Sequence, residues 1–504
     1  MSKKVLIFFP STADRGRIAT FTPTLMGIAK SRGWKTKYFD TNFYEKDFEE
    51  NFSPKNSSAI EKIGGFKKAP KESELDLKPN KYIVEDLQKI MDDFSPDLIA
   101  ITVMTNDFQH LETFWPKIRV PKHTKIIVGG VHAMFATEEI LKTGFFDLVC
   151  TGQGEEVFSE VLENIEKNAP MDSIDGTIFY DKITKKTKEN RLRMLLSGGD
   201  LWRFPVDYEE FDHRYYIQPF DGRVVNYLLL EVGRGCPYNC SYCSAPVIRE
   251  RFKGLGKYFT TRPIESIFNF IKKVNELQKI DVYNITHENF LMQKRDFLEE
   301  FVDRWAKEVR KPFFIQTRAE TINEENLLLL KKSQAPVIQI GLGIESGSKR
   351  ILDLCNKKTQ HQEIINAYRL MSKHGIRTNA FYMIGFPSET RKDIFDTIEL
   401  CRQVKSDINV ISTFQPFPGL PLTKYAIEKG YMTGKERIPA YTGFSIIKNS
   451  EMTSQEIENL RNTFILYAKL PKELYPDIEK CEKNPKENQK LFDKLLSIRW
   501  EENK

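Results

Sequence analysis

Short apolar runs alternate with amphipathic stretches along the first part of the chain. The runs are rich in β-branched and aromatic residues, and the stretches between them repeat apolar positions at helical spacing. Alternation of this kind is typical of an α/β fold with a parallel, doubly wound sheet that binds ligands at the carboxyl ends of its strands. We therefore expect strands at Val5–Phe9, Lys35–Asp40, Asp97–Met104, Lys125–Val128 and Asp147–Cys150, and a small edge strand at Thr177–Tyr180.

Two stretches depart from this alternation. Between Asn42 and Asn80 the sequence is dominated by Lys, Glu, Ser, Pro and Asn, which predicts an insertion or a long loop. After a helix predicted at Glu155–Lys167, the stretch Ser197–Asp200 and the aromatic stretch Trp202–Tyr216 show neither helical nor strand periodicity. We therefore place a Rossmann-like first domain at residues 1–185 and a linker at residues 186–222.

The alternation restarts at Tyr227 and continues through six strand–helix units. Parallel strands joined by helical crossovers curl into a partial (β/α)6 barrel, whose active site is expected at the carboxyl ends of the strands. We place this barrel at residues 223–420 and a helical region at residues 421–504, with helices at Ser454–Leu470 and Glu487–Trp500. The strands expected in the barrel are Tyr227–Val232, Asp281–Thr286, Phe313–Thr317, Val337–Gly343, Thr378–Ile384 and Asn409–Phe414.

Composition and charge narrow the class of protein. A chain of 504 residues exceeds the roughly 250–300 residues at which a single core stops growing, in keeping with several domains. The net charge of +6 is spread too thinly to predict nucleic-acid binding. The first apolar run, Val5–Phe9, is too short for a signal segment or a membrane span, so we expect a cytoplasmic protein without a membrane partner. Its cysteines are then expected to be reduced.

Three of the seven cysteines, Cys236, Cys240 and Cys243, follow a predicted strand with C-x3-C-x2-C spacing. Thiolates suit iron–sulfur clusters or zinc, and the neighbouring glycines let the backbone approach a bulky cluster. A closed zinc site needs a fourth ligand, usually from a second paired motif, and none stands nearby. Three ligands on a four-iron cube leave one iron open to bind and reduce a small molecule, so the spacing favours a catalytic cluster over zinc.

This segment resembles the radical S-adenosylmethionine (SAM) superfamily, whose cysteine motif follows the first barrel strand and has an aromatic residue before its last cysteine. Tyr242 stands at that place. The resemblance implies a [4Fe–4S] cluster on Cys236, Cys240 and Cys243. It also implies that SAM binds the open iron and that electron transfer breaks a C–S bond to give a 5′-deoxyadenosyl radical.

Two strand ends are candidates for the SAM pocket. In Ile340–Ser348 an apolar strand ends in glycines and polar residues, and the resemblance places Glu345 and Ser346 near the ribose and the methionine part; a helix cap with a tight turn is the alternative. At the end of Phe313–Thr317, Arg318 is expected to clamp the methionine carboxylate, with Gln316 beside it. A surface salt bridge for Arg318 and a hydrogen bond to a neighbouring strand for Gln316 remain open.

Two further strand ends carry weaker candidates. Asn379–Pro387 is similar to the family's fifth strand and its Gly-Phe-Pro turn, which abuts the adenine. Tyr382 and Ile384 are candidate contacts there, although apolar and aromatic residues of such a strand more often belong to the core. The second strand ends in His287-Glu288-Asn289, where relatives often carry paired aspartates or a Gly-Gly-Glu-like sequence. Glu288 is therefore a candidate catalytic acid or base, or equally a solvated carboxylate.

The segments Ile126–Ala133 and Phe146–Glu156 resemble the cobalamin-binding domain that precedes the barrel in one radical SAM subgroup. Glycines at strand ends allow a flat corrin and its tail to approach the backbone. The Asp-x-His-x-x-Gly motif, which supplies a lower histidine ligand in other cobalamin domains, is missing from Pro10–Gly16. The alternatives are cobalt without a histidine below it or a degenerate scaffold. The residues expected to contact cobalamin are Thr105, Asn106, Gly129, Gly130, His132, Gly152 and Gly154.

The resemblance implies an enzyme that uses SAM and cobalamin to transfer a methyl group to an unactivated carbon of a small molecule or peptide, with an electron donor such as flavodoxin or ferredoxin. Ring formation, rearrangement or methylation at phosphorus would use the same cofactors. A methylthio-transferase is disfavoured because those relatives carry three further cysteines in their first domain, whereas Cys150 alone precedes Cys236. A non-catalytic cobalamin or cluster sensor is the alternative from another class.

Overall fold

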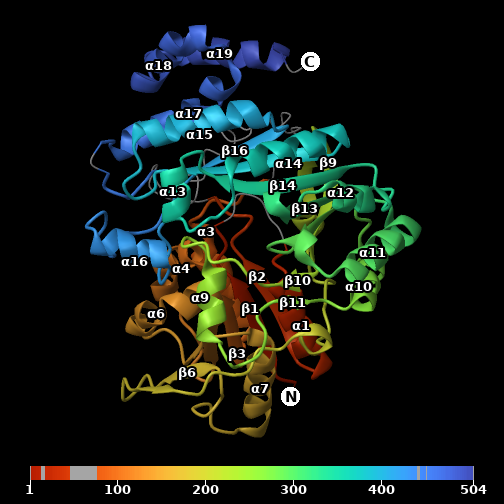
Figure 1. Ribbon diagram of the computed structural model, residues 1–504. Helices are drawn as coiled ribbons and strands as arrows, with labels where there is room; N and C mark the ends of the chain where they lie inside the picture. Colours follow the sequence, from red (N-terminus) through yellow and green to blue (C-terminus); the bar gives the residue numbers. More distant parts are fainter. Residues whose placement is uncertain (1, 13–17, 46–75, 440–442, 450, 503–504) are drawn as a thin grey trace.

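The chain folds into two α/β domains followed by a helical carboxyl-terminal region (Figure 1). The computed structural model describes residues 2–12, 18–45, 76–439, 443–449 and 451–502, so most of the predicted Asn42–Asn80 insertion lies outside the described residues. In Figure 1 the first domain (red to yellow) lies below the second (green to cyan), and the last helices (blue) lie at the top. Within the described residues, no helix has the length and apolar composition needed to cross a membrane.

The first domain is built on a seven-stranded sheet with the strand order β2-β1-β3-β4-β5-β6-β7. Strands β1 to β5 are parallel, and β6 and β7 add to the edge in antiparallel orientation. β1 is buried over nearly all of its length, as expected of a parallel strand covered by helices on both faces. The predicted doubly wound sheet is confirmed. Its strands are β1 (Lys4–Phe9), β2 (Lys35–Asp40), β3 (Leu98–Thr102), β4 (Lys125–Gly129), β5 (Leu148–Cys150), β6 (Thr177–Tyr180) and β7 (Thr187–Glu189).

The second domain is built on a sheet with the order β16-β15-β14-β13-β12-β9-β8. Within this sheet the strands β9, β12, β13, β14, β15 and β16 are all parallel, which confirms the partial (β/α)6 barrel. β8, which lies inside the predicted linker, pairs antiparallel with β9 and extends the sheet at its edge. The strands are β8 (Ile217–Phe220), β9 (Arg223–Glu231), β12 (Val282–Thr286), β13 (Phe313–Thr317), β14 (Ile338–Glu345), β15 (Arg377–Ile384) and β16 (Ile408–Thr413).

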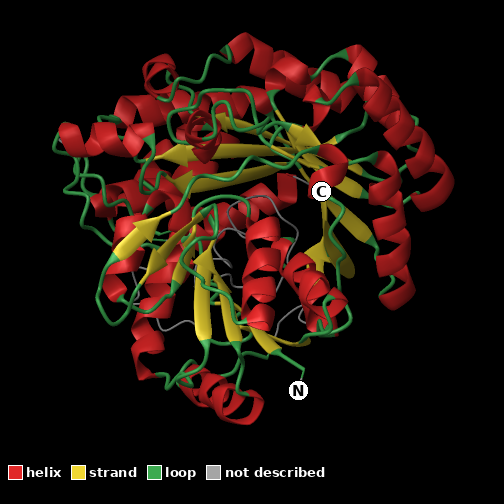
Figure 2. Cartoon of the chain, turned by 90° about the horizontal axis from the view of Figure 1, so that it is seen from below, coloured by secondary structure: helices red, strands yellow, loops and turns green. Residues whose placement is uncertain are grey.

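Helices cover the outer faces of both sheets (Figure 2). The first domain and linker contain α1 (Phe21–Ser31), α3 (Tyr82–Phe94), α4 (Thr105–Phe114), α5 (Val131–Phe135), α6 (Thr137–Thr143), α7 (Gly154–Lys167) and α8 (Gly198–Leu201). The barrel region contains α9 (Ser244–Arg251), α10 (Ile264–Leu277), α11 (Arg295–Arg304), α12 (Glu324–Lys331), α13 (Lys349–Leu354), α14 (His361–Lys373), α15 (Arg391–Val404) and α16 (Pro421–Glu428).

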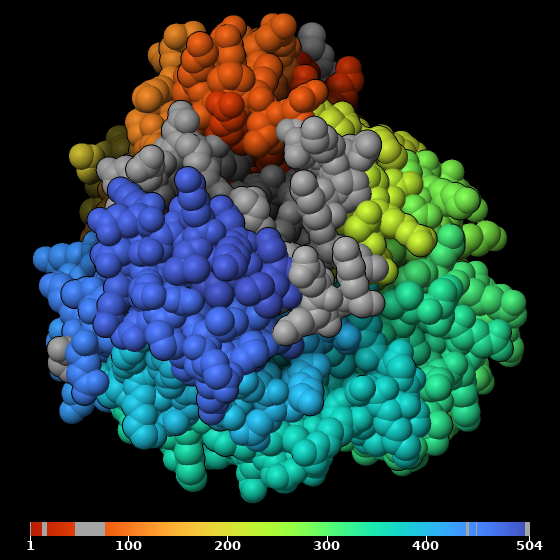
Figure 3. Space-filling model, turned by 90° about the horizontal axis from the view of Figure 1, so that it is seen from above, coloured from red at the N-terminus to blue at the C-terminus, as the bar shows by residue number. Residues whose placement is uncertain are grey.

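The carboxyl-terminal helices pack on the last strands of the barrel. They are α17 (Ser454–Lys469), α18 (Tyr475–Lys483) and α19 (Gln489–Glu502). The ring of Tyr382 on β15 lies 5.7 Å from that of Phe464 on α17, and Arg391 on α15 forms an ion pair with Glu482 on α18. Figure 3 shows the carboxyl-terminal region in blue next to the cyan part of the barrel. The predicted helical region is confirmed and completes the burial of the outer face of β15.

The linker crosses α1 at a glycine. A Cβ atom at Gly27 would lie 2.2 Å from the carbonyl oxygen of Pro205, so the two backbones are in direct contact there. The amide of Asp207 donates to the carbonyl of Pro23 over 2.9 Å, and the Asp207 carboxylate lies 2.7 Å from the amine of Lys30. The linker is therefore fixed to the first domain before it enters the barrel.

We predict that Gly27→Ala lowers the free energy of unfolding by about 1–3 kcal/mol, although alanine is the better helix former, because its Cβ must displace the linker backbone. Thermal and urea unfolding followed by circular dichroism would measure this. The matched control is Gly199→Ala in α8, where an added Cβ meets no atom within 4 Å. A Gly27→Ala protein as stable as the wild type would contradict the close contact.

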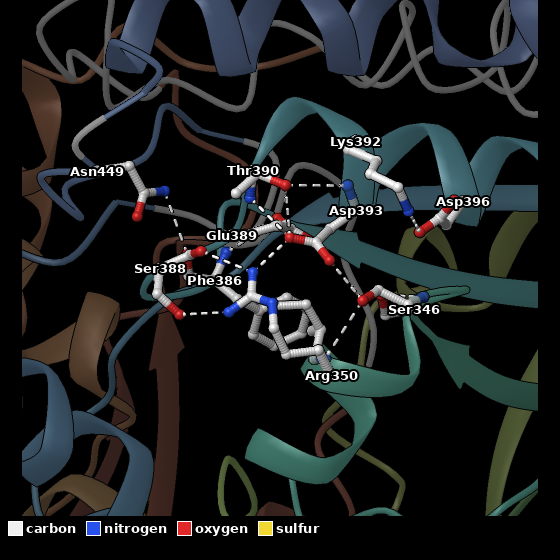
Figure 4. Close-up of polar contacts among 12 residues, drawn as sticks. Ser346, Arg350, Phe386, Ser388, Glu389, Thr390, Lys392, Asp393, Asp396 and Asn449 are labelled. Atoms are coloured by element: carbon white, nitrogen blue, oxygen red, sulfur yellow. Dashed lines mark hydrogen bonds and ion pairs between the residues drawn. The ribbon is translucent and has the colours of Figure 1, made fainter.

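A polar network ties the ends of β14 and β15 to α15 (Figure 4). Asp393 accepts hydrogen bonds from Thr390 in the capping box of α15 and from the hydroxyl of Ser348, and it pairs with Arg350. These contacts hold the pKa of Asp393 well below its usual range although burial opposes its ionisation. The hydroxyl of Ser346 belongs to the same network, since it contacts the hydroxyl of Thr397.

Glu389 fixes the Gly-Phe-Pro turn that follows β15. Its Oε2 accepts hydrogen bonds from the backbone amides of Gly385 and Phe386, whereas its Oε1 is buried and has no partner within the described residues. Burial raises the pKa of Glu389 to about 8. A neutral carboxyl group at this turn is therefore the form that folding favours.

We predict that Glu389 makes stability depend on pH. Because its pKa is 4.5 in the unfolded chain and about 8 in the folded one, the stability it contributes is present below pH 4.5 and is lost as the pH rises towards 8. The slope for one proton is at most about 1.4 kcal/mol per pH unit. Glu389→Gln, which resembles the neutral acid, should flatten this slope in thermal unfolding curves. Glu300→Gln on the exposed face of α11 is the control, and equal slopes in all three proteins would contradict the prediction.

Candidate active site

The three cysteines lie on one loop at the carboxyl end of β9. The loop follows β10 (Gly233–Arg234), which pairs with β11 (Thr260–Thr261), and ends where Cys243 precedes α9. Gly235 has a φ of +99°, and a Cβ atom there would lie 2.4 Å from the carbonyl oxygen of Tyr258. Only glycine fits this position, so the chain enters the cysteine loop along a fixed path.

The donor set of the loop fits an iron–sulfur cluster. Cys236, Cys240 and Cys243 are free, and burial raises the pKa of Cys236 and of Cys243, the latter to about 11. Three free thiols on one loop are the soft sulfur ligands that iron–sulfur clusters take as thiolates. Within the described ranges no three His, Cys, Asp or Glu side chains are arranged to hold a single metal ion. A cluster differs because each thiolate binds a different iron, which requires wider spacing.

Arg318 lies against the cysteine loop and is already paired. Its Nη1 donates to the Sγ of Cys240 over 3.5 Å, and its guanidinium lies 3.8 Å from the centre of the Tyr238 ring. Its Nε and Nη2 both donate to the carboxylate of Glu320, over 3.3 and 2.7 Å. The planar guanidinium group of Arg318, which we expect to bind the methionine carboxylate, is thus paired with Glu320 in this structure. Gln316, the other candidate on β13, has an exposed side chain.

Tyr242 and Glu345 are brought together although they lie far apart in the sequence. The hydroxyl of Tyr242 donates to Oε1 of Glu345 over 2.9 Å, and the amine of Lys357 lies 3.4 Å from the same oxygen. Glu345 has a φ of +70° at an irregularity at the end of β14. A Cβ atom at Gly343 would lie 2.3 Å from Oε1 of Glu345, so the glycine makes room for the carboxylate.

Three other candidates for the SAM pocket lie elsewhere. Ser346 is fully buried, and its hydroxyl accepts a hydrogen bond from the amide of Ser348 in the network of Figure 4. Tyr382 and Ile384 are fully buried and belong to the core between the sheet and its outer helices. The alternative interpretation of this region, a helix cap with a tight turn, therefore describes its contacts, because Ser346 and Ser348 connect the end of β14 to α15.

Glu288 lies beside the cysteine loop. Its Oε1 accepts a hydrogen bond from the backbone amide of Gly235 over 2.9 Å, directly before Cys236. The neighbouring His287 is buried, and burial lowers its pKa to about 4, so it is neutral near pH 7. Its Nδ1 accepts from the amide of Asn289 over 2.9 Å. The end of β12, which pairs with β9, thus supports the start of the cysteine loop.

A cavity of about 350 Å³ lies between the two domains. The carboxyl ends of β3, β4 and β5 line one side of it, and β9, β10, α9 and Tyr258 line the other. Most of its wall is apolar, with Phe21, Phe158, Ile248 and Phe252 among the lining residues. Four of the residues expected to contact cobalamin line this cavity together: Gly129, Gly130, Gly152 and Gly154. Its place at the carboxyl edge of a doubly wound sheet is the usual ligand position for such a fold.

The other three candidates for cobalamin contact do not line this cavity. Asn106 on α4 donates to the carbonyl of Ile438 over 2.6 Å. The hydroxyl of Thr105 lies 3.2 Å from Nδ1 of His132, whose pKa is lowered to about 4 by burial. Thr105 lines a separate cavity of about 840 Å³ between the first domain and the region after β16. Thr105 and Asn106 follow β3, and His132 follows β4, as expected. The turns into α4 and α5, however, direct these residues away from the cavity between the domains.

Sequence reasoning missed the charged group that joins the domains at this cavity. Arg234 lies 2.8 Å from Glu155 of α7 and 2.7 Å from Glu231 of β9. The second oxygen of Glu155, Oε2, is buried with no hydrogen-bond partner within the described residues, and all three side chains line the cavity. The only signal in the sequence is a Gly-Glu pair at a predicted helix start, which is too common to single out.

Comparisons with known proteins agree with this architecture. Residues 230–401 match the family model of the radical SAM superfamily, and residues 71–162 match that of the B12 binding domain. An uncharacterized methyltransferase of Pyrococcus horikoshii is 26% identical over 403 residues, which are 78% of this chain and 83% of that protein. The anaerobic magnesium-protoporphyrin IX monomethyl ester cyclase of Cereibacter sphaeroides is 25% identical over 67% of this chain and 54% of its own length.

Two solved structures share the fold. The radical SAM methyltransferase TsrM from Kitasatospora setae, solved with cobalamin and a [4Fe–4S] cluster, superposes with a TM-score of 0.59 at 14% identity, covering 85% of this chain and 75% of that one. The cobalamin-dependent SAM radical enzyme OxsB superposes with a TM-score of 0.62 at 14% identity, covering 99% of this chain and 71% of that one. The chain therefore joins a region that matches the B12 binding domain to one that matches the radical SAM superfamily, and it shares the fold of these two solved structures.

Proposed function

We propose that the protein cleaves SAM reductively at a [4Fe–4S] cluster held by Cys236, Cys240 and Cys243, and uses cobalamin to methylate an unactivated carbon of a small molecule or peptide. The radical SAM and B12-binding domains imply these three cofactors. One observation carries the proposal: Arg234 lines the cavity between the domains and lies two residues before Cys236. The proposed cobalamin site and cluster site are therefore adjacent.

The cluster, when bound, supplies the electron that cleaves SAM, and cobalamin supplies the methyl group. The residues of the chain bind and orient the reactants. Gly129, Gly130, Gly152 and Gly154 let the corrin tail approach the strand ends, and the apolar wall around them excludes water. Tyr242 and Glu345 offer SAM a hydrogen-bonding edge beside the cysteines.

Two assignments complete the proposal. Glu288, held by the amide of Gly235, is the candidate for moving a proton near the cluster. A one-electron donor such as flavodoxin or ferredoxin has to reduce the cluster from outside. Substrate methylation would be read directly by supplying SAM with a deuterium-labelled methyl group and following the label into the product by mass spectrometry.

Radical cyclisation is the second candidate, supported by the 25% identity to the anaerobic cyclase. It needs the same cofactors but does not transfer a methyl group. The labelled-methyl experiment separates the two functions, since a cyclised product lacks the label and loses hydrogen. A protein that binds the cluster and cobalamin but releases no deoxyadenosine under any reducing condition would instead be a sensor.

We predict that Cys236→Ala lowers the iron content and abolishes SAM cleavage, because the cluster loses one of its three protein ligands. Iron and sulfide analysis after anaerobic reconstitution, with chromatography of deoxyadenosine, would measure this. Cys481→Ala is the control, since Cys481 is also a free cysteine but lies buried on α18. Cleavage that persists in the Cys236→Ala protein would refute the proposed reaction.

We predict that Gly154→Leu weakens cobalamin binding about tenfold or more while iron content is kept, because the new side chain enters the 350 Å³ cavity. Gly154 suits this test since an added Cβ there meets no atom within 4 Å. Visible absorption after equilibrium dialysis against hydroxocobalamin would give the affinity. Gly199→Leu, outside the cavity, is the control. Unchanged binding in Gly154→Leu would exclude this cavity as the cobalamin site.

A further inference from the structure

The segment Leu354–Thr359, which follows α13, holds the cysteine loop from behind. The carbonyls of Leu354 and Cys355 accept hydrogen bonds from the hydroxyl and the amide of Ser241, each over 2.9 Å. The side-chain amide of Asn356 donates to the carbonyl of Asn239 over 2.8 Å. Ser241 and Asn239 flank Cys240, so this segment fixes the centre of the loop.

The same segment also fixes two charged side chains beside the loop. The hydroxyl of Thr359 accepts from Arg318 over 2.9 Å and donates to Glu320 over 2.6 Å. Lys357 is buried, with only 4% of its side chain exposed, and its amine faces Glu345. Lysine is almost never buried without a partner, and Glu345 is the ion-pair partner that the described residues provide.

The carboxylate of Glu345 is held by one of its two oxygens. Tyr242 and Lys357 both meet Oε1, whereas the described part of the chain gives Oε2 no hydrogen bond. A Cβ atom at position 343 would lie 2.3 Å from Oε1, so the glycine there lets Oε1 keep its place against the strand. The contacts to Oε1 therefore fix the orientation of Oε2, which is free to accept a hydrogen bond from a ligand.

Charge explains why a cation is needed at this place. Glu345 is buried and meets the cysteine loop through Tyr242, and an unpaired carboxylate in such a place would be poorly solvated. The amine of Lys357 offsets this charge without occupying Oε2. The adjacent Lys358 is exposed and makes no such contact within the described ranges.

We propose that Lys357 is a positioning residue for SAM binding: it holds Glu345 so that Oε2 accepts a hydrogen bond from SAM beside the cysteine loop. This inference rests on the proposed function. Lys357 acts through Glu345 and does not touch the reacting atoms. The segment Leu354–Thr359 thus fixes the cluster loop with its backbone and the SAM pocket with its side chains.

Lys357→Met is expected to raise the dissociation constant of SAM about tenfold or more, with iron content unchanged, because Glu345 loses the cation that orients it. SAM affinity would be measured by equilibrium dialysis on anaerobically reconstituted protein, and the change that SAM causes in the electron paramagnetic resonance spectrum of the reduced cluster gives a second readout. Lys357→Arg should restore most of the affinity. Lys358→Met is the matched control and should bind SAM as the wild type does.

The double variant Lys357→Met/Glu345→Gln separates positioning from a structural role. If Lys357 acts through Glu345, removing it has no further effect once Glu345 is neutral, so the double variant binds SAM as Glu345→Gln does. The double variant also decides the question if Lys357→Met alone fails to fold, since it leaves no unpaired buried charge. Weaker binding in the double variant than in Glu345→Gln would overturn the inference.

The experiments distinguish a failure of the role of Lys357 from a failure of the proposed function. Wild-type affinity in Lys357→Met overturns the role of Lys357 and leaves the proposed function intact. A reconstituted wild-type protein that holds no four-iron cluster or does not bind SAM overturns both.

Discussion

One charged contact between the domains governs the arrangement of the whole site. Arg234 bridges Glu155 of the first domain and Glu231 of the barrel, and it leads directly into the cysteine loop. A guanidinium stays charged at any physiological pH, and losing it would strand the buried Glu155 without a partner. The cavity and the loop are therefore kept in one geometry by an interaction that neither domain can make alone.

Two cations near the cysteine loop are each paired with a carboxylate. Arg318 is paired with Glu320, and Lys357 is paired with Glu345. Each pair leaves one polar atom unused by the partner: Nη1 of Arg318 meets Cys240, and Oε2 of Glu345 has no hydrogen bond in the described chain. Such half-satisfied pairs orient polar atoms towards a ligand at little cost, because the charges offset each other before the ligand arrives.

The sequence predicts the strands of both sheets well because parallel strands read as continuous apolar runs. The strands β7, which has three exposed polar residues, and β8 were not predicted from the sequence, because short edge strands carry no such run. The cysteine motif was predictable from its spacing, and the strand-end glycines from the resemblance to a cobalamin-binding domain. The partners of Arg318 and the difference between Lys357 and its neighbour Lys358 were not, since burial and pairing arise only when segments distant in the sequence meet.

The cavity between the domains draws its walls from both, and this sets an order of assembly. The strand ends of the first domain leave the ribosome early, but Ile248, Phe252 and Tyr258 complete the apolar wall only after the barrel has begun to fold. The linker, fixed across α1 at Gly27, shortens the search between the two halves. A ligand of this cavity therefore binds only after the two domains have met, and its uptake reports on their assembly.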